Sequence, residues 1–125
     1  MNILVVEDDA FFQKFYVLKL QELGHTVELA PDGEVAIELL KNKIYDCILL
    51  DIIMPKKNGF EVLTFASQNG LTQKTPFIMF STLGQEEDMK KALSLGAHDY
   101  VNKAFFDFDT LISKIQSIAV SKTTA

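Results

Sequence analysis

Short apolar runs alternate along the chain with longer stretches in which apolar residues recur every three or four positions. Five of the short runs have the length and the β-branched or aromatic content of buried strands, and they cover residues 3–6, 26–30, 46–50, 77–80 and 98–102. A stretch with helical periodicity follows each run. The pattern therefore predicts five strand–helix units in one domain over residues 1–120, with no internal repeat or linker.

Turn-forming and capping residues delimit the helices, which we expect over residues 10–23, 33–42, from Gly59 onward, between Gly84 and Gly96, and over 106–120. Their expected core-facing positions are Phe12, Phe15, Tyr16, Leu20 and Leu23, then Val35, Ala36, Leu39 and Leu40, then Phe60, Val62, Leu63 and Phe65, and finally Phe108, Leu111, Ile112, Ile115, Ile118 and Ala119. Residues 121–125 lack periodicity, so we expect them to form a flexible tail.

Strands that alternate with helices at short spacing favour a parallel sheet covered on both faces, because right-handed crossovers leave few other arrangements. The predicted fold class is doubly wound (βα)5 α/β, with the flavodoxin-like strand order 2-1-3-4-5. Ligands of such sheets bind outside the carboxyl ends of the strands, at the switch point between the first and third strands. Polar side chains occupy these strand ends, namely Glu7, Asp8, Asp51, Ser81 and Lys103.

Composition narrows the class of protein. The 125 residues carry a formal net charge of -5, which argues against direct nucleic acid binding, since that affinity rests on clustered Lys and Arg. Cys47 has no partner in the chain, so we expect a reduced, buried thiol. No secretory signal pattern and no run of about 18 apolar residues is present. We therefore expect a cytoplasmic protein that makes no contact with a membrane.

The carboxyl ends of the predicted strands form one edge of the sheet, here called the rim. The three acids at this rim, Glu7, Asp8 and Asp51, indicate a cation site. Two carboxylates about 4 Å apart repel by roughly 4 kcal/mol at an effective dielectric constant of about 20, so a cluster needs a cation or raised pKa values. Mg²⁺ suits this site, because it is a hard ion that keeps several waters and needs few protein ligands. No His or second Cys accompanies the acids in the sequence, which disfavours zinc.

These residues fall within four segments that together resemble the receiver domain of two-component response regulators, typified by the single-domain chemotaxis regulator. The segments are ILVVEDD at 3–9, LLDIIMP at 49–55 with Asn58-Gly59, FST at 80–82 and GAHDYVNK at 96–103. Each segment alone is weak evidence, whereas four in this order and spacing are specific. The resemblance spans the chain from end to end.

The resemblance implies a role for each residue at the rim. Asp51 would be the phosphoacceptor, and Ser81 and Lys103 would contact the phosphoryl oxygens. The Mg²⁺ ligands would be Asp8, Asp51, the backbone carbonyl of Ile53 and, through water, Glu7. Such a domain is no enzyme in the usual sense, since it catalyses only its own phosphorylation and dephosphorylation.

The same resemblance implies a switch and two kinds of partner. A histidine kinase or histidine phosphotransfer protein would donate the phosphoryl group, and Ser81 would move toward it while Tyr100 fills the space behind. This movement would alter the face formed by the helix between Gly84 and Gly96, the strand at 98–102 and the helix at 106–120. A downstream effector or a second copy of the chain would bind that face. Exposed Phe11 and Leu18 would suit docking of the phosphoryl donor, unless a neighbouring helix covers them.

The chain departs from the family pattern at positions close to the predicted site. Ala104 replaces the usual Pro after Lys103, where the peptide bond is usually cis, and a cis bond before Ala costs about 2.5–4 kcal/mol. In the family, the side chains at the positions of Ile53 and Leu83 lie near the path of the water that attacks the phosphoryl group. Both residues are apolar and cannot orient a water, which predicts a long-lived phosphorylated form. Thr82 replaces a smaller residue beside Ser81 and would crowd its movement.

Other readings of these residues remain open. A receiver-like interaction module that works without phosphorylation would also fit Ala104 and Thr82. A phosphatase of the haloacid dehalogenase type normally has a second Asp two residues after its nucleophile, and here that residue is Ile53. For Asp9, and with lower weight for Asp8, capping of the first helix is an alternative to any role at a metal.

Overall fold

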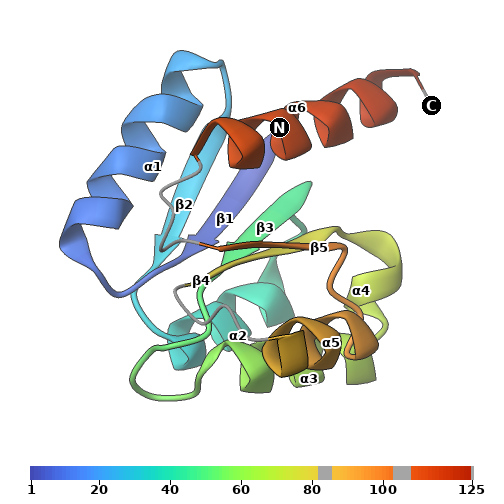
Figure 1. Cartoon of the computed structure of the whole chain (residues 1–125). Coiled ribbons are helices and arrows are strands. Elements are labelled where there is room, and N and C mark those ends of the chain that lie inside the picture. Colours follow the sequence, from blue (N-terminus) through green and yellow to red (C-terminus); the bar gives the residue numbers. More distant parts are fainter. Residues whose placement is uncertain (82–85, 103–107, 125) are drawn as a thin grey trace.

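The computed structural model describes residues 1–81, 86–102 and 108–124 (Figure 1). Five strands make one parallel sheet at its centre, and they are β1 (Asn2–Val6), β2 (Thr26–Ala30), β3 (Cys47–Leu50), β4 (Phe77–Ser81) and β5 (Asp99–Asn102). The strand order is β2-β1-β3-β4-β5, which confirms the predicted doubly wound fold. Val6 pairs with Ala30 on one side and with Leu50 on the other, so three strands end at one level.

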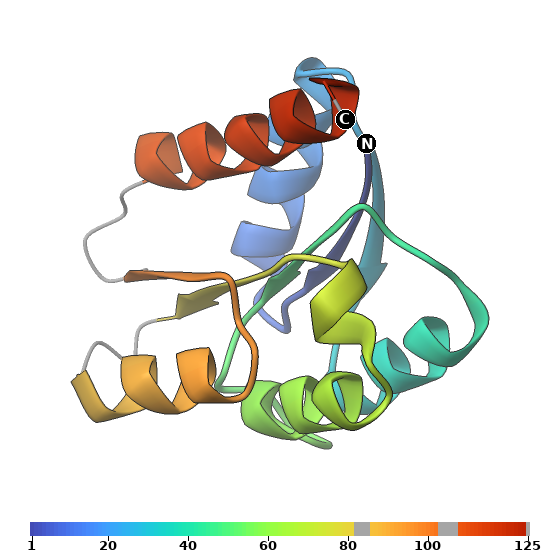
Figure 2. The ribbon, with the colours of Figure 1, turned by 90° about the vertical axis from the view of Figure 1, so that its right-hand side faces the viewer.

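Helices cover both faces of the sheet. They are α1 (Ala10–Glu22), α2 (Gly33–Asn42), α3 (Gly59–Gln68), the short α4 (Leu71–Lys74), α5 (Glu86–Ser94) and α6 (Phe108–Thr124). The two views show α1 and α6 on one face and α2, α3 and α5 on the other (Figures 1 and 2). Because all five strands are parallel, their carboxyl ends lie along one edge of the sheet, which is the rim.

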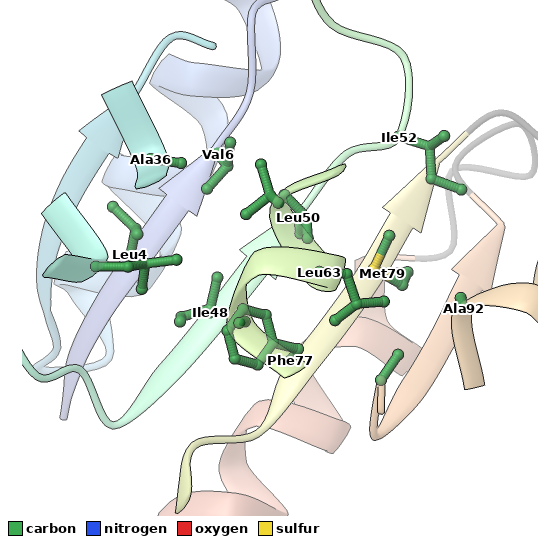
Figure 3. Close-up of a cluster of buried hydrophobic side chains, with 14 of the residues drawn as sticks. Leu4, Val6, Ala36, Ile48, Leu50, Ile52, Leu63, Phe77, Met79 and Ala92 are labelled. Carbon is green, nitrogen blue, oxygen red and sulfur yellow. The ribbon is translucent and has the colours of Figure 1, made fainter. Parts of the chain in front are cut away.

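Alternation along the strands divides the core into two clusters. Ile3 and Val5 on β1 belong to the cluster under α1 and α6, whereas Leu4 and Val6 belong to the cluster under α2, α3 and α5. Figure 3 shows the second cluster. These β1 side chains are 0–1 % exposed, and full burial of such a side chain contributes roughly 1.5–3 kcal/mol. Packed apolar side chains thus cover both faces of the sheet that carries the rim.

Polar residues start the helices that leave the rim. The Asp9 carboxylate accepts a hydrogen bond from the backbone amide of Phe12 at 3.1 Å, which confirms Asp9 as the N-cap of α1. Asp32 caps α2 in the same way, and Asn58 forms a reciprocal capping box with Glu61 at the start of α3. Such caps typically contribute about 1 kcal/mol each.

Two residues expected in the core are exposed instead. Leu23 was expected in the core but is 42 % exposed, because α1 ends at Glu22 and Leu23 serves as its C-cap. Val35 is 38 % exposed, because Ala36 and Leu40 make the buried stripe of α2 and Val35 lies about 100° around the helix from Ala36.

Element boundaries also differ from the expected ones. The strands begin at Cys47 and Asp99, one residue later than predicted, and the sequence pattern missed α4, whose four residues are too few to show helical periodicity. The last helix was expected to end at residue 120 but continues to Thr124. No Gly or Pro lies between Phe108 and Thr124 to stop it.

Candidate functional site

Three acidic side chains meet where β1 and β3 end. Glu7 and Asp8 follow β1 directly and Asp51 follows β3, and the backbone amide of Asp51 donates to the carbonyl oxygen of Val6 at 3.1 Å. One carboxylate oxygen from each acid lies within 4.8 Å of the others. Glu7 and Asp51 are buried, at 1 % and 7 % exposure, whereas Asp8 is exposed. The site therefore opens to solvent on the side of Asp8.

Backbone amides orient the Asp51 carboxylate. Its Oδ1 atom accepts hydrogen bonds from the amides of Ile52 at 2.7 Å and Ile53 at 3.4 Å. Gly59 packs behind this turn, because a Cβ atom there would stand 2.2 Å from the carbonyl oxygen of Asp51. The Gly59 amide also donates to the carbonyl oxygen of Ile52 at 2.9 Å. The position of Asp51 is thus set by the start of α3 as well as by β3.

The chain around Glu7 is held from three sides. The Glu7 amide donates to the carbonyl oxygen of Ala30 at 3.0 Å, and its own carbonyl oxygen accepts from Nε2 of Gln13 at 2.6 Å. Its Oε2 atom accepts from the amide of Asp9 at 3.2 Å. Hydrogen bonds to β2 and to the start of α1 therefore fix the position of Glu7 in the site.

The oxygen donor set of the cluster fits Mg²⁺. Three carboxylates offer hard oxygen ligands, and Asp8 leaves the site open for the waters that Mg²⁺ retains. Among the residues that the structure describes, no His or Cys belongs to the cluster, so the ligands that zinc prefers are missing there. Ile53, whose backbone carbonyl is an expected metal ligand, lies two residues after Asp51 and has a side chain that is 53 % exposed.

Ser81 and Tyr100 form a buried polar pair on the neighbouring strands. Ser81 ends β4 and is fully buried, and Tyr100 on β5 is 7 % exposed. Their side chains are hydrogen-bonded, and this bond favours the phenolate. Burial, followed by the nearby carboxylate of Asp88, nevertheless raises the pKa of Tyr100 to about 12. Tyr100 therefore lies inside the molecule in this structure, against the residue predicted to move.

Some residues that carry sequence expectations lie outside the described part of the chain. They are Thr82, Leu83, Lys103 and Ala104 at the predicted site, Gly84 and Phe106 at the expected starts of two helices, and the side chain of Ala119. The isomer of the bond between Lys103 and Ala104 and the direction of the Lys103 side chain therefore stay predictions. For the other residues at the rim, Glu7, Asp8 and Asp51 come together, whereas Ser81 pairs with Tyr100.

Sequence reasoning overlooked Tyr16 as a residue of the site. It was assigned to the core stripe of α1, and it is indeed 2 % exposed. Its hydroxyl nevertheless has no hydrogen-bond partner among the described residues. Burial is the main cause that raises the pKa of the Tyr16 phenol, and the carboxylates of Glu7, Asp51 and Asp9 raise it further. A tyrosine among the phenylalanines of α1 was the only available signal in the sequence.

Within the described ranges, no helix is both long enough and apolar enough to cross a membrane.

Comparison with known proteins gives a consistent family. Residues 3–116 match the sequence profile of the response regulator receiver domain. The transcriptional regulatory protein CpxR of Escherichia coli strain K12 is 41 % identical over 117 residues, which are 94 % of this chain and 48 % of that protein. The transcriptional regulatory protein DltR of Streptococcus agalactiae is 37 % identical over 116 residues, which are 93 % of this chain and 50 % of that protein.

The chain thus spans about half the length of these curated relatives. Among solved structures, the receiver domain of the Francisella response regulator 1452 matches with a TM-score of 0.89 at 30 % identity, covering 97 % of this chain and 98 % of that one. The chemotaxis response regulator CheY4 of Vibrio cholerae matches with a TM-score of 0.84 at 27 % identity, covering 94 % and 97 %. Fold, sequence profile and relatives agree, and the chain belongs to the receiver domain family of two-component response regulators.

Proposed function

We propose that this domain accepts a phosphoryl group on Asp51, with Mg²⁺ bound by the acid cluster. The observation that carries the proposal is the cluster itself, in which oxygens of Glu7, Asp8 and Asp51 lie within 4.8 Å of one another. A structural relative, the response regulator TrrA of Thermotoga maritima, was solved in complex with Mg²⁺ and BeF, and it is 29 % identical with a TM-score of 0.81. It covers 94 % of this chain and 97 % of its own.

Each residue would have a distinct role in the transfer. An Asp51 oxygen would form a bond to phosphorus while the bond from phosphorus to the donor's histidine nitrogen breaks, and that nitrogen keeps the electron pair. The amides of Ile52 and Ile53 orient the attacking carboxylate through Oδ1. Asp8, Asp51, the Ile53 carbonyl and, through water, Glu7 would hold Mg²⁺, which neutralises negative charge on the phosphoryl oxygens when bound. Lys103 would add a second positive charge.

The switch would run through Ser81 and Tyr100. A phosphoryl group adds about -1.5 to -2 charges and three acceptor oxygens, so the Ser81 hydroxyl gains a stronger acceptor than Tyr100 offers. A shift of Ser81 would release its bond to Tyr100 and change the position of Tyr100 relative to the Asp88 carboxylate in the first turn of α5. The surface of α5, β5 and α6 would carry this change to a downstream effector or to a second copy of the chain.

The phosphoryl donor would be a histidine kinase or a histidine phosphotransfer protein that docks on α1. Phe11 and Leu18 are 58 % and 61 % exposed, so the alternative that a neighbouring helix buries them does not hold. A Phe11→Ser, Leu18→Ser protein should accept phosphate slowly from a kinase that labels the wild type, yet react normally with phosphoramidate. Ile44→Ser, at a 90 % exposed position outside α1, is the matched control.

The decisive experiment is intact mass after incubation with phosphoramidate and Mg²⁺. We expect one phosphoryl adduct in the wild type and none in Asp51→Asn or in the presence of EDTA. Asp46→Asn is the matched control, because Asp46 precedes the other end of β3 and accepts a hydrogen bond from the Asn2 amide at 2.7 Å. No adduct in the wild type would overturn the proposal and favour the interaction module that works without phosphorylation.

A further inference from the structure

The Tyr16 hydroxyl is a buried polar group with no hydrogen-bond partner in the part of the chain that the structure describes. The Tyr16 ring lies among aromatic neighbours, with centroids 6.0 Å from Phe12, 5.6 Å from Phe80 and 6.0 Å from Phe108. These contacts come from α1, β4 and α6, so the ring is held on several sides. Its oxygen has no hydrogen-bond partner among the described residues. Because an unsatisfied buried hydroxyl is costly, native proteins rarely keep one without a use.

Helix direction places this hydroxyl toward the acid cluster. Side chains of an α-helix lean toward its N-terminus, and long side chains extend further in that direction. The N-terminus of α1 follows β1 at the rim, with only three residues between Val6 and Ala10. This lean runs from the second turn of α1 back toward the rim, where Glu7 and Asp51 lie. The carboxylates of both acids act on its phenol, in agreement with this direction.

We infer that Tyr16 is a positioning residue of the cation site, whose hydroxyl bonds to water that enters with hydrated Mg²⁺ and so helps to hold Glu7 and that water in place. The inference rests on the proposed Mg²⁺ site. A tyrosine hydroxyl both donates and accepts, so it can donate to a water while that water donates to the Glu7 carboxylate. Mg²⁺ gives up its waters reluctantly, and a buried hydroxyl held by the surrounding rings offers such a water a defined partner.

Tyr16→Phe tests the inference, because it removes one oxygen and leaves the aromatic contacts. We would measure the Kd for Mg²⁺ by calorimetry and the Tm with and without Mg²⁺. The variant should bind Mg²⁺ roughly three- to tenfold more weakly, from the loss of one hydrogen bond. Its Tm without Mg²⁺ should be equal to or above that of the wild type, since an unsatisfied group is gone. Mg²⁺ should therefore raise the Tm of the variant by less.

Tyr45→Phe is the matched control. Tyr45 is also buried, but it precedes the amino end of β3 and its hydroxyl donates to Oε1 of Glu28 on β2 at 2.5 Å. This control should lose stability and keep the Mg²⁺ affinity of the wild type. Equal Mg²⁺ affinity in Tyr16→Phe and wild type would overturn the inference while leaving the proposed function intact. A wild type that binds no Mg²⁺ would overturn both.

A double-mutant cycle with Glu7→Gln identifies the partner of the hydroxyl. If Tyr16 acts through the water at Glu7, the two substitutions remove the same interaction. The fold loss of Mg²⁺ affinity in the double variant should then be smaller than the product of the fold losses in the two single variants. Strictly multiplicative losses would contradict an action through Glu7. The Kd and the Tm shift both report on Tyr16 without any phosphorylation step.

Discussion

Gly33 at the start of α2 lies directly against the backbone of Lys57, so that a Cβ atom at Gly33 would stand 1.9 Å from the Lys57 carbonyl oxygen. The adjacent Glu34 amide donates to the carbonyl oxygen of Lys56 at 2.9 Å. Lys56 and Lys57 have φ angles of +49° and +74°, backbone values that residues other than Gly rarely adopt. The loop after β3, which begins at Asp51, is thus held in a strained form by α2.

Replacing Gly33 by Ala should destabilise the protein, because the new Cβ atom meets backbone that has to move. Overpacking of this kind typically costs about 1–3 kcal/mol. Urea unfolding followed by circular dichroism would measure the loss. Ser67→Ala, on the exposed side of α3, should change the free energy of unfolding by less than about 0.5 kcal/mol. Equal stability of Gly33→Ala and wild type would mean that the contact relaxes freely.

Asp8 and Asp9 are neighbours in sequence that should respond in opposite ways to substitution. Asp9→Ala removes the N-cap of α1 and should cost about 1 kcal/mol of stability, with little effect on Mg²⁺ affinity. Asp8→Ala should abolish tight Mg²⁺ binding and raise the Tm without metal, because it relieves repulsion with Glu7 and Asp51. Calorimetry and thermal unfolding would separate the two. A loss of Mg²⁺ affinity in Asp9→Ala equal to that in Asp8→Ala would contradict this division.

Alkaline pH should unfold the protein rather than titrate its tyrosines in place. Burial is the main cause that raises the pKa of all three, Tyr16, Tyr45 and Tyr100, with Tyr100 at about 12. Unfolded tyrosines ionise near pH 10, so above that pH the unfolded state loses protons that the native state keeps. This contribution to stability is complete below about pH 10 and, for Tyr100, is lost as the pH rises to about 12.

Phenolate absorbance and helical circular dichroism, recorded together against pH, would check this. Phenolate should appear only as the helical signal disappears. Tyr100→Phe should weaken the pH dependence of stability between about pH 10 and 12, because the native state of this variant no longer holds that proton. One tyrosine that ionises near pH 10 while the helices stay intact would show that its side chain is open to solvent.

The phosphorylated form should be long-lived, because Ile53 cannot orient a water for attack on the phosphoryl group. Its side chain is 53 % exposed beside Asp51, so a polar replacement would reach solvent without disturbing the core. Ile53→Asn should therefore speed phosphoryl loss by at least about threefold, measured by the decay of the adduct in intact mass spectra. Ile44→Asn makes the same change at an exposed position away from the rim and should leave the decay unchanged.

Much of this molecule follows from residue pattern because parallel sheets leave few choices. The runs at 3–6 and 47–50 are apolar on both faces, which marks central strands, and the polar residue that follows each must then lie at the carboxyl edge. The meeting of Glu7, Asp8 and Asp51 could be expected on these grounds. Asp9 could be recognised as a cap, because capping is a local interaction between residues three apart.

Contacts between residues distant in sequence required the tertiary structure. Nothing local to Gly33 indicates that the Lys57 carbonyl lies against it, and the exposure of Val35 depends on how α2 rotates over the sheet.

Tyr16 is the clearest case. Its place in the helical pattern determined that its ring is buried, because periodicity reports which face of a helix is apolar. Only the packing of α1 against β4 and α6 decided that its hydroxyl has no partner among residues 1–81, 86–102 and 108–124, because hydrogen-bond satisfaction depends on atoms that distant segments bring together.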